Sequence, residues 1–257
     1  MDTNQHKVAL VTGSDSGIGQ ASAIELARDG FDVIINYLHD SDGAEHTRRE
    51  VEALGREAVV VQADVGVEDD VERMFDTAIE ALGQVDVLMN AAGVDASGTP
   101  VAEMDIAAFE ASMRTNLSGP VLCSKHYLRR RQDSRPGRIL NVTSVHEEIP
   151  RAGAADYDCA KGAVRNLTRT LALELAEQGV TVNSIAPGMV LTPFNQEAVD
   201  DPKVREEQVQ SIPMKRAAEP REVGRLAAFL ASDDASYITG ASYVIDGGLM
   251  QNQGQGA

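Results

Sequence analysis

Residues 7–30 read KVALVTGSDSGIGQASAIELARDG, and this stretch decides the fold. Residues 7–12 are a short apolar run with β-branched side chains, which predicts a buried strand. A glycine-rich turn follows, and from Ile18 apolar side chains recur at helical spacing until Gly30. A strand, a glycine turn and a helix in this order predict the first unit of a β-α-β fold, whose helix N-terminus can stabilise an anion.

The same alternation continues to the end of the chain. Continuous apolar strands predict a parallel sheet buried on both faces by helices. We therefore predict an α/β fold: a single Rossmann-type doubly wound domain with an about seven-stranded parallel sheet and helices on both faces. Further strands are expected at 32–37, 57–65, 85–93, 137–144, 180–187 and 241–248, and further helices at 43–55, 68–83, up to about 132, about 157–178 and near 219–231.

Composition narrows the class of protein. The 40 acidic against 23 basic residues give a net charge of −17, which opposes binding to nucleic acid or an anionic membrane. No apolar run approaches the ~20 residues of a membrane span, and the first residues lack the pattern of a signal peptide. The two cysteines have neither metal-ligand nor redox spacing. We expect a cytoplasmic protein without a metal, nucleic-acid or membrane partner.

The glycine turn fits the phosphates of a dinucleotide. Gly13, Gly17 and Gly19 have G-x-x-x-G-x-G spacing, which lets the backbone approach a pyrophosphate. At the end of the third strand Asp64 can accept from an adenine amino group, and the small residues at 90–93 leave room for a ribose. All lie at C-terminal strand ends, where open α/β sheets bind ligands. The sequence predicts a site for NAD or NADP.

Residues 144–161 read SVHEEIPRAGAADYDCAK and carry a hydroxyl, a phenol and an amine. Lys161 follows Tyr157 by four residues, so on a helix both lie on one face and the ammonium favours the phenolate. Ser144 closes a strand and can bind a substrate oxygen while Tyr157 exchanges its proton. His146 follows at once and is expected to line the substrate cleft. This arrangement predicts hydride transfer between an alcohol or carbonyl carbon and a nicotinamide.

The second strand gives little preference between the two dinucleotides. It ends in Asn36 and Tyr37, so the acid that would bind a ribose 2′-hydroxyl is missing, and so is a cation for a 2′-phosphate. Asp15 in the glycine turn opposes a phosphate. We expect use of both NAD and NADP, with at most a modest preference for NADP.

Seven motifs together resemble the classical short-chain dehydrogenase/reductase family over essentially the whole chain. They are TGSDSGIG, ADV, NAAG, the asparagine of TNLSG, Ser144, YDCAK and APGMVLTP, in family order. NAAG in place of NNAG and Asp15–Ser16 within the turn are mild departures. The resemblance implies an NAD(P)-dependent oxidoreductase acting on a CH–OH group of a small molecule. It implies one domain, 1–257, with a cofactor half at about 1–135 and a catalytic and substrate half at about 136–257.

The family motifs also assign roles to individual residues. The resemblance implies catalytic roles for Asn116, Ser144, Tyr157 and Lys161, with Asn116 holding a water that links Lys161 to solvent. Substrate contacts are expected from Ser144, His146, Asp95 and Asn195. The residues expected to bind the cofactor are Gly13, Ser16, Gly17, Ile18, Gly19, Asn36, Tyr37, Asp64, Val65, Asn90, Ala91, Gly93, Tyr157, Lys161, Pro187, Gly188, Val190 and Thr192.

The substrate is expected to be a sugar. SVHEEIP, LTPFNQEAVDDP and SIPM resemble bacterial glucose 1-dehydrogenases, although RAGAAD at 151–156 and Asp95 replace a bulkier, aromatic-containing stretch and a glutamate of that subgroup. A 3-oxoacyl-carrier-protein reductase or other ketone reductase is the alternative, but the net charge of −17 does not suit an acidic carrier. A catalytically silent cofactor sensor would lack one of the reactive residues. Residues 189–218, broken by prolines, are expected to form a mobile flap, and residues 241–257 resemble a tetramer-forming C-terminus, which implies a homotetramer.

Overall fold

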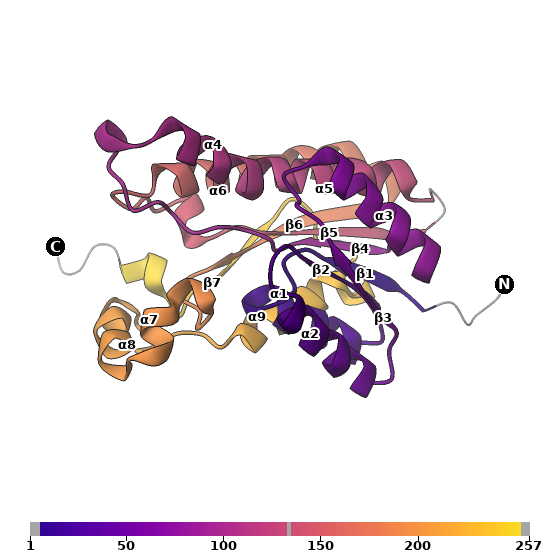
Figure 1. Ribbon diagram of the computed structural model, residues 1–257, viewed down its shortest axis with the longest axis horizontal. Coiled ribbons are helices and arrows are strands. Elements are labelled where there is room, and N and C mark those ends of the chain that lie inside the picture. Colours follow the sequence, from indigo (N-terminus) through magenta and orange to yellow (C-terminus); the bar gives the residue numbers. More distant parts are fainter. Residues whose placement is uncertain (1–5, 133–134, 253–257) are drawn as a thin grey trace.

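The computed structural model describes residues 6–132 and 135–252 and contains one seven-stranded parallel sheet in the order β3-β2-β1-β4-β5-β6-β7 (Figure 1). This confirms the predicted fold class. Residues 253–257, part of the stretch behind the tetramer expectation, lie outside the described residues. The strands are β1 (Val8–Val11), β2 (Asp32–Tyr37), β3 (Ala58–Gln62), β4 (Val87–Asn90), β5 (Gly137–Val142), β6 (Val180–Pro187) and β7 (Ser242–Ile245).

Helices cover both faces of the sheet. Figure 1 shows α3, α4, α5 and α6 on one face and α1, α2 and α9 on the other. No helix within the described ranges is long and apolar enough to cross a membrane. The helices are α1 (Gly17–Arg28), α2 (Ser41–Ala53), α3 (Glu68–Leu82), α4 (Ile106–Met113), α5 (Gly119–Arg130), α6 (Ala155–Leu175), α7 (Gln196–Asp200), α8 (Pro202–Gln208) and α9 (Pro220–Ala231), with shorter turns η1 (Val101–Glu103), η2 (Arg114–Ser118), η3 (Val145–Glu147), η4 (Ala176–Gln178), η5 (Pro193–Asn195), η6 (Val209–Ser211), η7 (Asp233–Ala235) and η8 (Leu249–Asn252).

The strands read as unbroken apolar runs because each of their faces is buried in a different cluster. Val33 and Ile35 of β2 pack in the cluster beneath α1 and α9, whereas Ile34 between them packs in the cluster that includes Phe75 of α3 and Tyr127 of α5. Successive strand residues point to opposite faces, so two helical layers require apolar residues at every position. The helices thereby hold the C-terminal strand ends in one row.

Ion pairs stabilise the end of the sheet at which the strands begin. The Lys7 ammonium lies 3.0 Å from an Asp233 oxygen, and Asp86 accepts from the Val8 amide at 2.9 Å and pairs with Arg135, also at 2.9 Å. Burial raises the pKa of the Asp86 carboxyl. These bonds join the starts of β1 and β4 to η7 and to the segment that leads into β5.

The single long helix predicted to reach about residue 132 is wrong. The chain instead leaves β4 as a loop, forms α4, which Asp105 caps through a 3.0 Å bond from the Ala107 amide, and then makes the π-helical turn η2 before α5. Polar and small residues within a stretch whose apolar residues have helical spacing thus mark an interruption of the helix. A π-turn of this kind often occurs where a helix carries a functional side chain.

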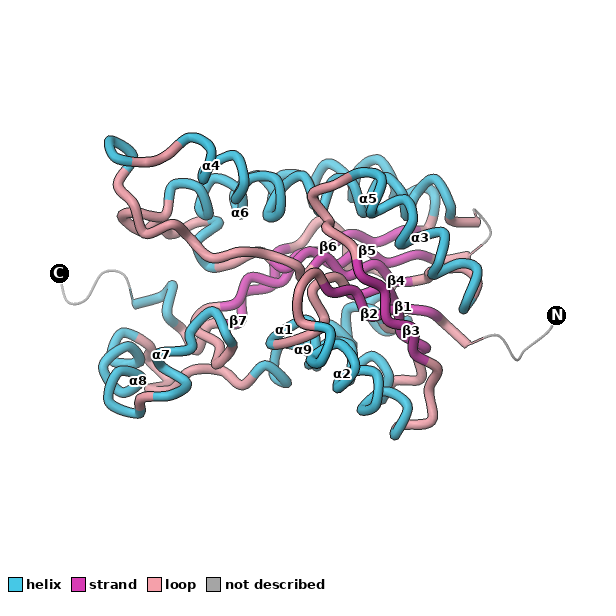
Figure 2. The backbone as a smooth tube through the Cα atoms, in the orientation of Figure 1, coloured by secondary structure: helices cyan, strands magenta, loops and turns pink. Residues whose placement is uncertain are grey.

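Residues 189–218 form a separate layer of short helices (Figure 2). A bridge between Val190 and Ala218 joins the two ends of the segment, which has a small core of its own around Val209 and Ile212. Figure 2 shows α7 and α8 beside the end of β7. The segment is therefore held at both ends, near the carboxyl edge of the sheet; its mobility stays a prediction.

Candidate active site

The glycine turn after β1 folds tightly onto itself and onto the exit of β4. Gly13 and Gly17 have φ values of +59° and +54°, which non-glycine residues rarely adopt. A Cβ at Gly13 would lie 2.7 Å from the Ala92 Cα, and one at Gly19 would lie 2.0 Å from the Gly13 carbonyl oxygen. All three predicted glycines are thus required by the tight backbone of the turn.

The N-terminus of α1 keeps its affinity for an anion. Ser16 is the N-cap, yet within the described chain its side chain makes no capping bond, and the first turn has no acid. The free amides and the helix dipole are a ready anion site. Thr192 of the 189–218 layer lies over this turn, because a Cβ at Gly17 would come 3.2 Å from its Cγ2 atom. These residues, with the neighbouring Ile18, fit a dinucleotide pyrophosphate.

Asn36 supports the turn from behind. Its side chain is buried, accepts from the Gly13 amide at 3.2 Å and donates to the Ala63 carbonyl at 3.1 Å. The carboxamide is therefore occupied by backbone partners. Asn36 thus positions the glycine turn, and Tyr37 is half-buried at the strand end; that both bind the cofactor stays a prediction.

Acidic groups gather near the end of β2, a feature that sequence reasoning recognised only in part. Burial raises the pKa of Asp15, and the charge of Asp40 raises it further while His39 lowers it. Asp40 caps α2 by accepting from the Gly43 amide at 2.9 Å. An aspartate as helix N-cap three residues beyond a strand end was the signal that could have found Asp40.

The ends of β3 and β4 hold the adenosine side of the predicted site. The Asp64 carboxylate accepts from the Gly66 amide at 2.8 Å, and the buried Val65 packs against Gly119 at the start of α5. Asn90 is buried and donates to the Asn141 side chain at 2.8 Å, so it joins β4 to β5 rather than facing the surface. A cofactor contact of Asn90 stays a prediction.

Thr12 fixes the exit of β4. Its hydroxyl oxygen accepts from the amides of Ala91 and Ala92 at 3.0 and 3.1 Å. A Cβ on Gly93 would lie 2.9 Å from Asn116 Oδ1 and 3.7 Å from Lys161 Nζ. Gly93 therefore allows the η2 turn and the catalytic segment to approach the strand end together.

The predicted reactive residues meet beyond β5. Lys161 Nζ lies 5.3 Å from the centroid of the Tyr157 ring and donates to the Val142 carbonyl at 3.0 Å. Ser144 is close enough to the phenol for a side-chain hydrogen bond that acts to lower the pKa of Tyr157. Both Tyr157 and Lys161 project from α6, as their four-residue spacing predicted.

Burial dominates the titration of both groups. It raises the pKa of Tyr157 to about 12 against the opposing hydrogen bond from Ser144, and lowers the pKa of Lys161 to about 8. Each charged form is disfavoured by desolvation. A phenolate and an ammonium that form together compensate one another, so the arrangement suits proton exchange with a bound oxygen.

Asn116 lies in the π-turn with its side chain directed at the loop after β4. Its carboxamide accepts from the Val94 amide at 3.1 Å and donates to the Val94 carbonyl at 3.0 Å. A further 3.1 Å contact reaches the Ser112 hydroxyl. The side chain thus fixes the loop beside Lys161, and the water relay expected of this asparagine stays a prediction.

Two of the expected substrate residues lie beside Tyr157. The His146 ring packs edge-on against the Tyr157 ring at 6.2 Å and donates from Nδ1 to the Ile149 carbonyl at 2.8 Å, which leaves Nε2 as an acceptor. Asp95 is half-exposed, pairs with Arg151 at 3.7 Å and acts to raise the pKa of Tyr157. Sequence reasoning missed Arg151, which the RAGAAD departure placed next to the catalytic helix.

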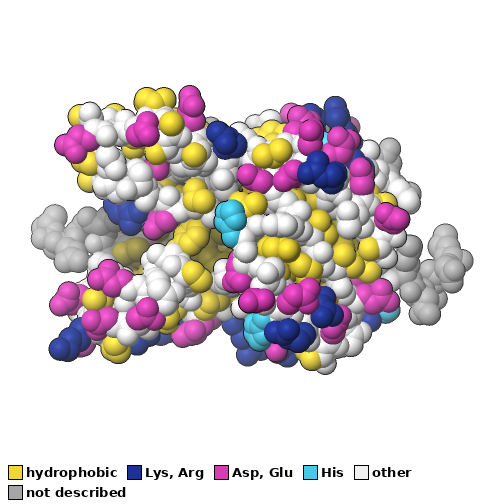
Figure 3. Space-filling model, in the orientation of Figure 1, with side chains coloured by type: hydrophobic (Ala, Val, Ile, Leu, Met, Phe, Trp, Pro, Cys, Tyr) yellow, Lys and Arg dark blue, Asp and Glu magenta, His cyan; other side chains and the backbone are white. Residues whose placement is uncertain are grey.

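The remaining predicted residues line the 189–218 layer. Asn195 donates to the Val190 carbonyl at 2.7 Å, so its amide is occupied within that layer. Val190 is buried in the sheet-side core, and Gly188 follows Pro187 where a Cβ would lie 2.8 Å from the Asp246 side chain. Figure 3 shows the molecule hollowed between this layer and the α4–α6 layer, with apolar side chains in the hollow.

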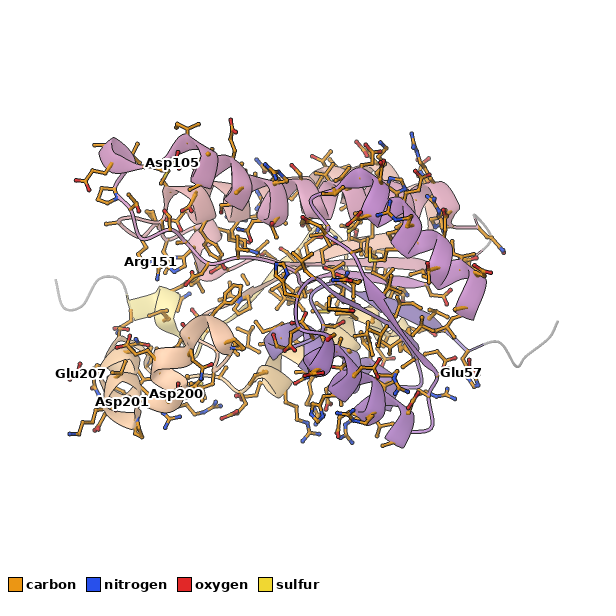
Figure 4. All side chains as sticks on the ribbon, viewed as in Figure 1. Glu57, Asp105, Arg151, Asp200, Asp201 and Glu207 are labelled. Carbon is orange, nitrogen blue, oxygen red and sulfur yellow. The ribbon has the colours of Figure 1, made fainter. Side chains whose placement is uncertain are left out.

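Arg151 lies at this opening. Figure 4 shows it between the two helical layers, pointing toward the hollow, whereas the labelled Asp200, Asp201 and Glu207 lie on the outer side of the α7–α8 layer. The ion pair of Arg151 with Asp95 therefore lies beside this hollow.

Comparison with known proteins identifies the family. A family model described as enoyl-(acyl carrier protein) reductase matches residues 13–250. The 3beta-hydroxysteroid dehydrogenase 1 of Eggerthella lenta is 40% identical over 252 residues, with 96% of this chain and 95% of the relative covered. Glucose 1-dehydrogenase 2 of Bacillus subtilis is 37% identical over 244 residues, covering 95% and 94%.

Solved structures agree. The crystal structure of acetoin dehydrogenase from Enterobacter cloacae has a TM-score of 0.88 and 38% identity, with 98% of each chain covered. A putative gluconate dehydrogenase from Agrobacterium tumefaciens has a TM-score of 0.89 and 33% identity, with 95% and 96% covered. The family uses nicotinamide dinucleotides, and its reactive motifs coincide with the residues that meet beyond β5. The chain belongs to the short-chain dehydrogenase/reductase family and is an oxidoreductase acting on CH–OH groups.

Proposed function

We propose that this chain interconverts an alcohol and a carbonyl with Tyr157 as the acid–base group, Ser144 as the donor to the substrate oxygen and Lys161 as the cation that favours the phenolate. The observation that carries the proposal is that Tyr157 lies within hydrogen-bond reach of Ser144 and has an ammonium 5.3 Å from its ring centroid. A bound nicotinamide cofactor supplies the hydride acceptor or donor. The chain's own residues hold the substrate oxygen, exclude water and exchange one proton at the Tyr157 oxygen.

The proton exchange follows from burial. In oxidation, the substrate hydroxyl gives its proton to Tyr157 O⁻ while Ser144 holds the oxygen; in reduction, Tyr157 returns it. A phenolate buried this deeply needs a nearby cation, because its pKa is otherwise about 12. Lys161 is the cation in contact with the ring, and the Gly13–Gly19 turn would bind the cofactor's pyrophosphate at the N-terminus of α1.

A sugar is the proposed substrate. His146 Nε2 and the Asp95–Arg151 pair offer both acceptors and donors beside Tyr157, which suits a molecule with several hydroxyl groups. The relative named glucose 1-dehydrogenase 2 supports this choice. The apolar lining of the hollow supports a second candidate, an apolar alcohol or ketone, and a relative named 3beta-hydroxysteroid dehydrogenase 1 is consistent with it.

A substrate panel separates these candidates. Purified protein is assayed for reduction of NAD and of NADP with aldoses, sugar acids, acetoin and a 3β-hydroxysteroid, and for the reverse reaction with a 3-oxoacyl thioester. The sugar proposal predicts the highest kcat/KM for an aldose. Turnover of the steroid or thioester without any aldose oxidation would overturn it, while absence of all activity would contradict the catalytic assignment itself.

We also propose that the chain is a single domain acting as a homotetramer in the cytoplasm, with either dinucleotide as cofactor. An apolar side chain such as Leu173 of α6, 84% exposed, supports burial against another copy. The homotetramer is tested by light scattering coupled to gel filtration, where a mass other than four times that of the chain contradicts it.

A further inference from the structure

One face of α6 carries three titratable side chains in a row. Tyr157, Lys161 and Arg165 are four residues apart, so they stack along the same helical stripe. The segment from Ser144 through η3 runs beside this stripe. Ser144 meets Tyr157 at one end, and at the other Glu147 meets Arg165, one turn beyond Lys161.

The Glu147 carboxylate is buried and held from two elements. Its side chain is only 1% exposed. The Oε1 atom accepts from the Ser242 hydroxyl of β7 at 2.5 Å and lies 3.5 Å from Arg165 Nε of α6. Oε2 is also buried and has no hydrogen-bond partner among the described residues. A carboxylate in such a place requires cations nearby to remain charged.

Arg165 does not fully neutralise the negative charge of Glu147. It also pairs with Glu148, through a 2.5 Å contact from Nη2. Two carboxylates around one guanidinium leave one negative charge, and Glu148 is 40% exposed whereas Glu147 is buried. The charge least screened by water is therefore that of Glu147, and the neighbouring cation on the same stripe is the buried Lys161.

The charged groups around Tyr157 and Lys161 act on different members of this pair. Asp95 and Arg151 from flanking loops, and Asp158 of α6 itself, act on the pKa of Tyr157. Within the described chain, Glu147 is the charged group that opposes the effect of burial on Lys161. The Val142 carbonyl of β5 and the Asn116 carboxamide of η2, which also face Lys161, are uncharged.

We propose that Glu147 is a positioning residue that keeps Lys161 cationic, acting through a buried carboxylate fixed by Arg165 and Ser242. The role rests on the proposed function, because a cationic Lys161 is what favours the Tyr157 phenolate. When a bound cofactor excludes further water from the site, the ammonium loses hydration and depends more on this carboxylate.

The proton on Lys161 is measured directly, without substrate or cofactor. The chain has five lysines, so protein labelled with ¹³C at the lysine ε-carbon gives few signals, and Lys161→Met identifies the one of interest. Its titration is followed by NMR in wild type and in Glu147→Gln, which keeps the shape and removes the charge. The pKa of Lys161 is expected to fall by about one unit in the variant.

Glu148→Gln is the matched control. It removes the same charge, one residue away and from the same arginine, but from an exposed position. This variant is expected to have the same Lys161 pKa as wild type. Unchanged titration in Glu147→Gln, or an equal shift in both variants, overturns the proposal.

If Glu147→Gln does not fold, a milder variant serves as the test. Ser242→Ala removes the hydroxyl that orients the carboxylate and keeps its charge, so the pKa of Lys161 should fall by a smaller amount; no change would also overturn the proposal. In turnover, the acid limb of the kcat–pH profile for alcohol oxidation, which reports formation of the Tyr157 phenolate, should move to higher pH in Glu147→Gln alone. An inactive wild type contradicts the proposed function and leaves the NMR result standing as the test of this inference.

Discussion

The ammonium of Lys161 and the ring of Tyr157 are 5.3 Å apart, and the hydrogen bond of that ammonium goes to the Val142 carbonyl. In the proposed reaction Lys161 therefore acts on the phenol through its charge. The carbonyl fixes the direction of the lysine side chain, so its position does not depend on whether Tyr157 is protonated. This separation makes the roles of the two residues distinguishable by substitution.

Tyr157→Phe is expected to abolish turnover and to leave cofactor affinity largely intact. The substitution removes the atom that exchanges the proton and little else, and acid–base catalysis is worth about 10²–10⁴-fold. Steady-state kinetics and a fluorescence titration with NAD and NADP measure the two effects. Lys161→Ala is the comparison, because it should weaken cofactor binding as well. A Phe variant with a rate near that of wild type would remove Tyr157 from the mechanism.

Lys161→Met is expected to stabilise the cofactor-free protein near pH 7. Burial lowers the pKa of Lys161 from 10.5 to about 8, so between these values the unfolded chain holds a proton that the native chain has lost, and stability rises with pH. Below that window the buried ammonium costs ~3 kcal/mol at most, which methionine avoids. Urea unfolding should show an advantage for the variant near pH 7 that shrinks toward about pH 10. An advantage independent of pH would contradict the origin of this effect.

Asp15→Asn is expected to raise the affinity for NADP relative to NAD. Asp15 and Asp40 place two acids near the end of β2, where they repel a ribose 2′-phosphate. Removing one charge should change the ratio of the two dissociation constants by ~0.5–1 kcal/mol, or roughly two- to fivefold. Glu207→Gln, on the outer side of α8 (Figure 4), is the control of equal charge change and should leave the ratio unaltered. In wild type the two affinities are expected to differ by less than about 3 kcal/mol.

His146→Ala is expected to reduce kcat/KM for an aldose by ~1–3 kcal/mol in transition-state free energy. The ring lies beside Tyr157 with Nε2 available to a substrate hydroxyl, and its loss leaves that hydroxyl unpaired. Cofactor affinity should not change. Equal kcat/KM values for the variant and wild type would place His146 outside the substrate contacts.

The sequence predicted those parts of the site that depend on short spacings. Gly13, Gly17 and Gly19 follow a strand and open a helix, and Tyr157 and Lys161 are one helical turn apart, so their placement follows from local geometry. The sheet was predictable for the same reason, since apolar runs and helical periodicity are local signals.

Contacts between distant segments could not be predicted in this way. Whether Asn36 faces a ligand or the backbone depends on how closely β2 packs between β1 and β3. The interruption of the helix at η2 depends on the bond of Asn116 to the loop after β4. Glu147 looked like an ordinary polar residue after a strand, because one of its partners, Ser242, is 95 residues away.

The ion pairs of Lys7 with Asp233 and of Asp86 with Arg135 lie at the sheet edge opposite the reactive residues. Protein engineering can therefore treat the two edges as separate design regions. Substitutions that stabilise the starts of β1 and β4 can raise the melting temperature without altering the cleft. The added stability would then offset destabilising changes at the other end of the strands, such as loop replacements at 151–156 that alter substrate specificity.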